Sequence, residues 1–307
     1  MGIKESYVSY LKVKDSSEVT IKDYLVSLNK VSQYLLGKKF DECSIADFAE
    51  LSIEAPITLI GLMKNDNLRA NTIKARLNSL KSINGFLGDY GYITRDDQYT
   101  KDYLKNKRMK ELKDKSEDVK QKDVLTKEEI NRLLVAVQML GKHVLRRKLF
   151  ILILVNTGIR IGAFIKIKLS DINWDDNTVT IREKGDKVRV KKLNSEIMET
   201  LKVYITRERV RYANEKSGEY VFITNRGTAL TARHSDAEIK TICEKAGIKK
   251  KIHCHRLRAT TATMVYEKTN DVEAVRRVLG HASISTSQIY IDRINESKND
   301  EALDLFA

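Results

Sequence analysis

The chain has 307 residues, enough for one large domain or two ordinary ones, and 42% of them are hydrophobic. This composition can form buried cores and excludes a disordered chain. Lys and Arg number 56 against 42 acidic residues, so the formal net charge is +14. A charge of this size suits a polyanionic partner such as nucleic acid, although a generally lysine-rich protein would show it too.

The cysteines and the apolar runs indicate the compartment. Cys43, Cys243 and Cys254 are too few and too scattered for a disulfide framework or a zinc site, which favours a reducing, intracellular environment. The residues after Met1 are polar, unlike a secretory signal, and the longest apolar run, at 149–155, is too short to span a bilayer. We therefore expect a soluble, cytoplasmic protein.

The first 98 residues have the pattern of a small all-α domain. Apolar residues recur at helical spacing from Ile21 to Leu35, and Gly37 follows where a C-cap glycine belongs. Further helices are expected at about 45–51, at about 56–63 and from about residue 71 onward. The last of these carries three basic residues on what we interpret as its outward side, either a DNA-binding face or an ordinary solvated one: Lys74, Arg76 and Lys81.

A second domain is expected after a charged linker at 99–124. It begins at Leu125, and Thr126 with Glu129 has the spacing of a helix capping box. The very apolar segment 149–155 predicts a buried helix that ends at Thr157 and Gly158.

A β-hairpin is predicted inside this second domain. The period changes to two, with Val179 and Ile181 before a Gly-Asp turn and Val188 and Val190 after it. Lys184 lies at the tip of this hairpin, and from about residue 193 the chain returns mainly to helices.

Five local features of this domain suit one reaction, although each is weak alone. An arginine after a glycine, a lysine in a turn, or a tyrosine near the end of a chain is usually an ordinary surface or packed residue. Their set and order carry the argument. The features are Arg160 after Thr157-Gly158-Ile159, Lys184 in the hairpin, His255 three residues before Arg258, His281 in Leu279-Gly280-His281, and Tyr290 nine residues later.

In this order and spacing, the chain from about 125 to 294 resembles the catalytic domain of tyrosine recombinases, especially Xer-type and phage-integrase-like members. The resemblance implies a mainly α fold with a small β-sheet, an α+β catalytic domain preceded by a small all-α core-binding domain. It divides the chain into a core-binding domain at 1–98, a charged linker at 99–124, a catalytic domain at 125–294 and a tail at 295–307 that docks on its own domain or on a neighbouring subunit.

The resemblance also implies the roles of the six residues. Arg160 and Arg258 would bind the phosphoryl oxygens, since a guanidinium is planar and stays charged. Tyr290 would attack and form a 3′-phosphotyrosine. Its phenol has an ordinary pKa of about 10, so His255 would act as the base. Lys184 would protonate the leaving 5′-oxygen, and His281 would contact the phosphate or position the nucleophile. No metal and no cofactor are expected.

Two positions depart from the family pattern. Family members often carry an acidic residue three positions after the first arginine, where this chain has Ala163, and a histidine after the second arginine, where it has Ala259. The first change bears on the fine positioning of the site.

The expected activity is site-specific recombination, for integration or excision of a mobile element or for resolution of DNA multimers. The implied partners are double-stranded DNA with a short inverted repeat, further copies of the chain in a tetramer, and either a helper protein or a second recombinase, with no membrane. The protein would then be nucleoid-associated when bound to DNA. Two alternatives stay open: a type IB topoisomerase-like enzyme that relaxes DNA, and a non-catalytic DNA-binding relative.

Overall fold

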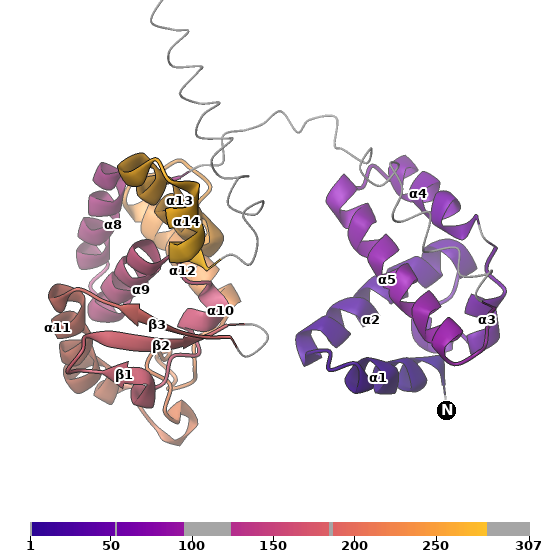
Figure 1. The fold of residues 1–307 in the computed structure, drawn as a ribbon, viewed down its shortest axis with the longest axis horizontal. Helices are drawn as coiled ribbons and strands as arrows, with labels where there is room; N and C mark the ends of the chain where they lie inside the picture. The colour runs from indigo at the N-terminus through magenta and orange to yellow at the C-terminus, as the bar shows by residue number, and fades with distance from the viewer. Residues whose placement is uncertain (1, 53, 95–123, 184–186, 281–307) are drawn as a thin grey trace, which may run out of the picture. The chain divides into compact units, whose positions relative to one another are not determined.

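The computed structural model describes residues 2–52, 54–94, 124–183 and 187–280. The chain divides into two compact units, Met1–Asp118 and Val119–Ala307 (Figure 1). The charged segment 99–124, apart from its last residue, and the tail 295–307 lie outside the described residues.

The described part of the first unit is helical. Its α-helices are α1 (Ile3–Val13), α2 (Glu18–Leu36), α3 (Ile45–Ala49), α4 (Ala55–Asn65) and α5 (Ala70–Asp89), with a 3-10 turn at Phe40–Glu42. As expected, the apolar stripes of α2 and α5 face the core, where Leu28 and Ile83 are fully buried. Gly37 caps α2 in the left-handed conformation, with φ 70°. The helix expected at 45–51 is shorter, because Glu50 forms its C-cap.

The second unit begins with three helices: α8 (Lys127–Met139), α9 (Val144–Thr157) and the short α10 (Ile161–Phe164). The capping box is confirmed, since Glu129 N–H donates to Thr126 Oγ1 at 3.2 Å and Thr126 N–H donates to Glu129 Oε2 at 2.8 Å. The predicted buried helix is also confirmed: α9 packs against α8, α11 and α13, and Phe150 and Ile151 are fully buried.

A three-stranded antiparallel sheet follows in the order β1-β2-β3. Its strands are β1 (Ile172–Asn173), β2 (Thr178–Arg182) and β3 (Val188–Lys192), and β2 pairs with β3 from Thr178↔Lys192 to Arg182↔Val188. The hairpin was therefore predicted correctly, and Val179 and Ile181 are buried.

The rest of the described unit is helical. It contains α11 (Ser195–Val203), α12 (Ala232–Lys245), α13 (Cys254–Thr269) and α14 (Val272–Leu279), with short turns of π and 3-10 helix between 204 and 217. Figure 1 shows the sheet and the helices of this unit, with α13 and α14 next to each other. None of the helices in the described ranges has the length and apolar character needed to cross a membrane.

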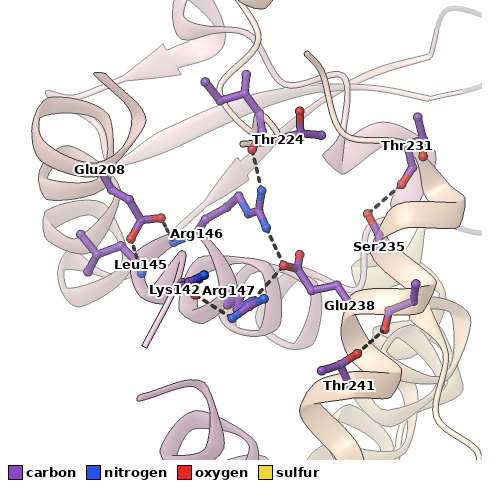
Figure 2. Close-up of polar contacts among 12 residues, drawn as sticks. Lys142, Leu145, Arg146, Arg147, Glu208, Thr224, Thr231, Ser235, Glu238 and Thr241 are labelled. Carbon is purple, nitrogen blue, oxygen red and sulfur yellow. Dashed lines mark hydrogen bonds and ion pairs between the residues drawn. The ribbon is translucent and has the colours of Figure 1, made fainter. Parts of the chain in front are cut away.

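A buried ion pair ties the beginning of α9 to α12 (Figure 2). Arg146, whose side chain is 3% exposed, lies 2.5 Å from Glu238 Oε1, and Arg147 Nε donates to the same oxygen at 2.9 Å. Glu208 accepts hydrogen bonds from the backbone N–H groups of Leu145 and Arg146. Because a buried charge is costly without partners, these contacts fix the beginning of α9, whose other end carries the candidate site.

Candidate active site

The site is built around the end of α9. Gly158 caps this helix with φ 62°, and a Cβ there would lie 2.4 Å from Leu279 Cδ2 and 3.2 Å from Thr261 Cγ2. Only glycine fits both this backbone conformation and the close approach of α13 and α14. The turn at Gly158 therefore brings the first arginine motif against the two helices that carry the later motifs.

Arg258 joins these elements from inside. It is 2% exposed, and its guanidinium donates to the backbone carbonyl of Gly158 and, at 2.9 Å, to that of Leu279. Thr261, one turn further along α13, donates to the carbonyl of Val155 at 2.9 Å. The second arginine thus contacts the segment before Arg160 and the segment before His281, so three sequence motifs meet at one side chain.

The histidine of the same motif is arranged differently. His255 lies in the first turn of α13, and its side chain is exposed. Its ring is parallel to that of His253, with an interplanar angle of 6° and centroids 6.5 Å apart. An exposed imidazole one turn before a buried arginine can exchange a proton with a bound substrate.

Arg160 is held by a carboxylate that the sequence patterns did not single out. Arg160 NH1 lies 2.7 Å from Glu183 Oε1; the side chain of Arg160 is 49% exposed and that of Glu183 only 5%. Ala163, which replaces the acidic residue of the family pattern, is buried. Among the described residues, Glu183 is thus a carboxylate placed to orient Arg160.

Strand β3 turns its apolar side chains outward and its cations inward. Val188 and Val190 are 59% and 62% exposed, so the apolar residues of this strand face outward. Its cations face inward: Arg189 donates to the carbonyl of Gly280 at 2.8 Å, and Lys191 Nζ donates to that of Val278 at 2.5 Å. The carbonyls at the end of a helix carry partial negative charge, and this attraction outweighs the burial of two valines.

These inward cations contribute to a positive site. Burial, and then the charges of Arg189 and Arg258, lower the pKa of Lys191. Arg189 Nε also lies 3.5 Å from Glu183 Oε2. Guanidinium and ammonium groups gathered around one carboxylate give an excess of positive charge, which suits a phosphate ligand.

The end of α14 depends on glycine for the same contact. Gly280 has φ 70°, and a Cβ there would lie 1.2 Å from Arg189 NH1. Asp271 caps the beginning of this helix and accepts a hydrogen bond from Glu273 N–H at 2.7 Å.

Of the six expected catalytic residues, the structure describes Arg160, His255 and Arg258. Lys184, His281 and Tyr290 lie outside the described residues. Lys184 directly follows Glu183 in the chain and His281 directly follows Gly280, and both of these neighbours contact Arg189. The residues that sequence reasoning missed are Glu183, Arg189 and Lys191. A usable signal was the two-residue period, which places Arg189 and Lys191 on one side of β3.

The three basic residues expected on one side of α5 do not share a side. At about 100° per residue, Lys74 and Lys81 point within roughly 20° of each other, whereas Arg76 is rotated by about 160° from Lys74. Arg76 instead helps to line a pocket of about 400 Å³, together with Lys30, Gln33, Tyr34, Leu68 and Thr72. The three residues therefore lie on two separate faces of α5, Lys74 and Lys81 on one and Arg76 on the other.

Comparisons with known proteins agree with this architecture. The sequence pattern of the Phage integrase family matches residues 123–296. Tyrosine recombinase XerH of Campylobacter jejuni is 34% identical over 180 residues, which cover 57% of this chain and 49% of that protein, so the match spans about half of the relative's length. Tyrosine recombinase XerD of Staphylococcus saprophyticus is 26% identical over 289 residues, 94% of this chain and 92% of that protein.

Solved structures have the same fold. XerH bound to its palindromic difH substrate, in a post-cleavage complex, has a TM-score of 0.68 at 24% identity, over 96% of this chain and 82% of that one. The Tn1549 transposon integrase bound to transposon right-end DNA has a TM-score of 0.65 at 16% identity, over 98% of this chain and all of that one. Because the integrase pattern spans more than half of the chain and includes every motif described above, the chain belongs to the phage integrase family of tyrosine recombinases.

Proposed function

We propose that this protein is a site-specific recombinase that cleaves and rejoins DNA through a 3′-phosphotyrosyl bond to Tyr290. The observation that carries the proposal is the buried guanidinium of Arg258, which joins the carbonyls of Gly158 and Leu279. This side chain holds together the segments that lead to Arg160 and to His281, and the family match extends past Tyr290.

The proposed reaction follows from the groups available. The phenol oxygen of Tyr290 attacks the scissile phosphorus and loses its proton to His255, while the bond from phosphorus to the 5′-oxygen breaks. Lys184 protonates that oxygen, and His281 contacts the phosphate. Arg160 and Arg258 bind the phosphoryl oxygens, whose charge rises in the transition state. The phosphotyrosine conserves the bond energy, so a 5′-hydroxyl can religate the strand by the reverse step.

The partner in this proposal is double-stranded DNA with a short inverted repeat, on which four copies of the chain assemble. Two solved relatives are complexes with DNA, XerH with difH and the Tn1549 integrase with its transposon end. The match to XerD over nearly the whole chain supports the proposed division into a core-binding domain at 1–98, a linker at 99–124, a catalytic domain at 125–294 and a tail at 295–307. This tail would dock on its own domain or on a neighbouring subunit of the tetramer. We propose that the protein acts in the cytoplasm and is associated with the nucleoid when it is bound to DNA.

The test is covalent capture on fragmented DNA of the source organism, comparing wild type with Tyr290→Phe. The mixture is denatured, and the ends of protein-linked fragments are sequenced. We expect adducts from wild type only, at a short inverted repeat. The variant should keep its DNA affinity, because it lacks a single hydroxyl.

The other outcomes would each reject part of the proposal. Adducts without sequence preference would indicate a type IB topoisomerase-like enzyme. Absence of adducts, with DNA binding equal in both proteins, would indicate a non-catalytic relative. Adducts formed by Tyr290→Phe would reject this nucleophile. Adding a cell extract that lacks the protein tests the need for a helper or a second recombinase.

A further inference from the structure

The carboxylate of Glu183 occupies an unusual place for a hairpin residue. Its side chain is only 5% exposed, and its two oxygens contact two different guanidinium groups, Arg160 at 2.7 Å and Arg189 at 3.5 Å. A buried carboxylate is costly unless it is paired, so this arrangement holds both arginines and the carboxylate in one geometry.

Arg189 extends the contact to the end of α14. It donates to the carbonyl of Gly280 at 2.8 Å, and Gly280 leaves no room for a side chain against it. A continuous chain of contacts therefore runs from Arg160 through Glu183 and Arg189 to Gly280. It joins the ends of α9 and α14 by a second route, beside the one through Arg258.

We propose that Glu183 is a positioning residue for strand cleavage, which orients Arg160 toward the scissile phosphate and, through Arg189, fixes the end of α14. The proposal rests on the function proposed above. Arg160 is half exposed, and a free arginine side chain loses rotamer entropy when it binds phosphate. Glu183 occupies one amino group and leaves further N–H donors of the guanidinium for phosphate oxygens, so the donors are oriented before the substrate arrives.

The position of Ala163 agrees with this assignment. Ala163 is 4% exposed and carries no polar side chain that could orient Arg160 from within α10. The hairpin supplies the carboxylate instead, from the residue directly before Lys184.

The test uses Glu183→Gln, which keeps the size of the side chain and removes its charge. Single-turnover cleavage is measured on a synthetic duplex that carries the sequence captured by wild type, at saturating DNA, and the Kd for the duplex is measured separately. We expect cleavage about 10- to 100-fold slower, the range for loss of a charge-assisted hydrogen bond. The Kd should stay within about twofold, because most phosphate contacts lie elsewhere.

Asp171→Asn is the matched control. Asp171, in the 3-10 turn just before β1, is also a buried carboxylate, 3% exposed, and is paired with Arg182 of β2. Its loss is expected to lower Tm and to leave the cleavage rate within about twofold of wild type, since it does not contact Arg160. Equal slowing by both variants would mean that any buried carboxylate next to this sheet affects cleavage, and would overturn the proposal.

A double-mutant cycle with Arg160→Lys shows whether Glu183 acts through Arg160. If it does, the fold reduction in cleavage rate of the double variant is smaller than the product of the fold reductions of the two single variants. Independent, multiplicative losses would overturn the proposal, as would wild-type cleavage by Glu183→Gln. Glu183→Asp keeps the charge on a shorter side chain and should cleave faster than Glu183→Gln; equal rates would also contradict it. If wild type itself formed no adducts, the proposed function would be rejected, and the role of Glu183 would be rejected with it.

Discussion

Arg258 is a charged side chain in the interior of the catalytic unit, and its environment explains how it is tolerated. At 2% exposure it would be very costly without partners, and its guanidinium donates to two backbone carbonyls at helix ends. Carbonyls at helix ends have no partner within their own helices. The guanidinium of Arg258 supplies their hydrogen-bond donors, and the carbonyls stabilise its buried positive charge. One residue thus serves both the packing of the unit and the proposed phosphate site.

This dual role predicts that the two arginines differ in their effect on stability. Arg258→Ala should abolish cleavage and also lower the free energy of unfolding by about 2–4 kcal/mol, because it leaves the carbonyls of Gly158 and Leu279 buried without a donor. Arg160→Ala should abolish cleavage at a smaller cost of about 1 kcal/mol, since this side chain is half exposed and the buried carboxylate of Glu183 keeps Arg189 as a partner. Urea unfolding of both variants, beside covalent capture, measures the difference. Equal stabilities would contradict the role given to Arg258 in packing.

At the scale of elements, the site is an assembly of helix ends. The ends of α9 and α14 meet at Arg258, and β3 contacts the end of α14 through Arg189 and Lys191. Both helices end at glycines in the left-handed conformation, Gly158 and Gly280, which open carbonyls toward these cations. Sharp helix ends therefore create the acceptors that the arginines and the lysine bind.

Most of these elements could be predicted from the sequence, since local signals specify them. The capping box at Thr126, the apolar run of α9 and the period of the hairpin all act within a few residues. The orientation of β3 could not be predicted in this way, because hydrophobic alternation favours buried valines. The observed orientation, with the valines outward and Arg189 and Lys191 inward, depends instead on contacts with α14, which lies far along the chain.

The site was predictable to the same extent. Spaced motifs singled out Arg160, His255 and Arg258 as candidates, whereas Glu183 was missed because its partners depend on how β2, β3 and α14 pack. Helix α1 was also missed. Its anchor, Tyr7, is fully buried and donates a hydrogen bond to Ser82 of α5 at 2.7 Å, a contact between residues distant in sequence.

Substitution of Gly280 tests the contact between β3 and α14. In Gly280→Ala the new Cβ collides with the far end of Arg189, a flexible side chain, so the arginine should move and lose its bonds to Gly280 and Glu183. We expect a cost of about 1 kcal/mol for the left-handed backbone and about 1 kcal/mol more for the lost hydrogen bond. Cleavage should slow by about 10-fold or more, because Glu183 then loses its contact with Arg189 and positions Arg160 less firmly.

Gly247→Ala is the matched control for this substitution. Gly247 lies in the same unit with φ 67°, and nothing lies within 4 Å of a Cβ placed there. The free energy of unfolding of Gly247→Ala should fall only by the cost of the left-handed backbone, about 1 kcal/mol, and its cleavage rate should equal that of wild type. Urea unfolding and single-turnover cleavage compare the two. An equal loss in both assays would show that the backbone conformation, and not Arg189, matters at Gly280.

The molecule as a whole divides into two compact units, Met1–Asp118 and Val119–Ala307. The division between them, at Asp118 and Val119, falls inside the charged segment expected as a linker at 99–124. The match to XerD of Staphylococcus saprophyticus covers 94% of the chain and so includes both units, whereas the family pattern covers 123–296. The family pattern, and with it the proposed chemistry, therefore lies in the second unit. The proposed function predicts that the first unit contributes to DNA affinity.

The net charge of +14 predicts binding that depends strongly on salt. Measured with Tyr290→Phe to prevent cleavage, the affinity for the captured DNA site should fall by about 100-fold or more between 50 and 200 mM NaCl, as for proteins that neutralise several phosphates.

The two faces of α5 give opposite predictions for this salt dependence. Arg76→Gln removes a cation from the pocket shared with Lys30 and Tyr34, and should reduce the slope of log K against log salt by about 0.9. Lys81→Gln, on the other side of the helix, should leave the slope unchanged, and the reverse result would assign the DNA to the face of Lys74 and Lys81.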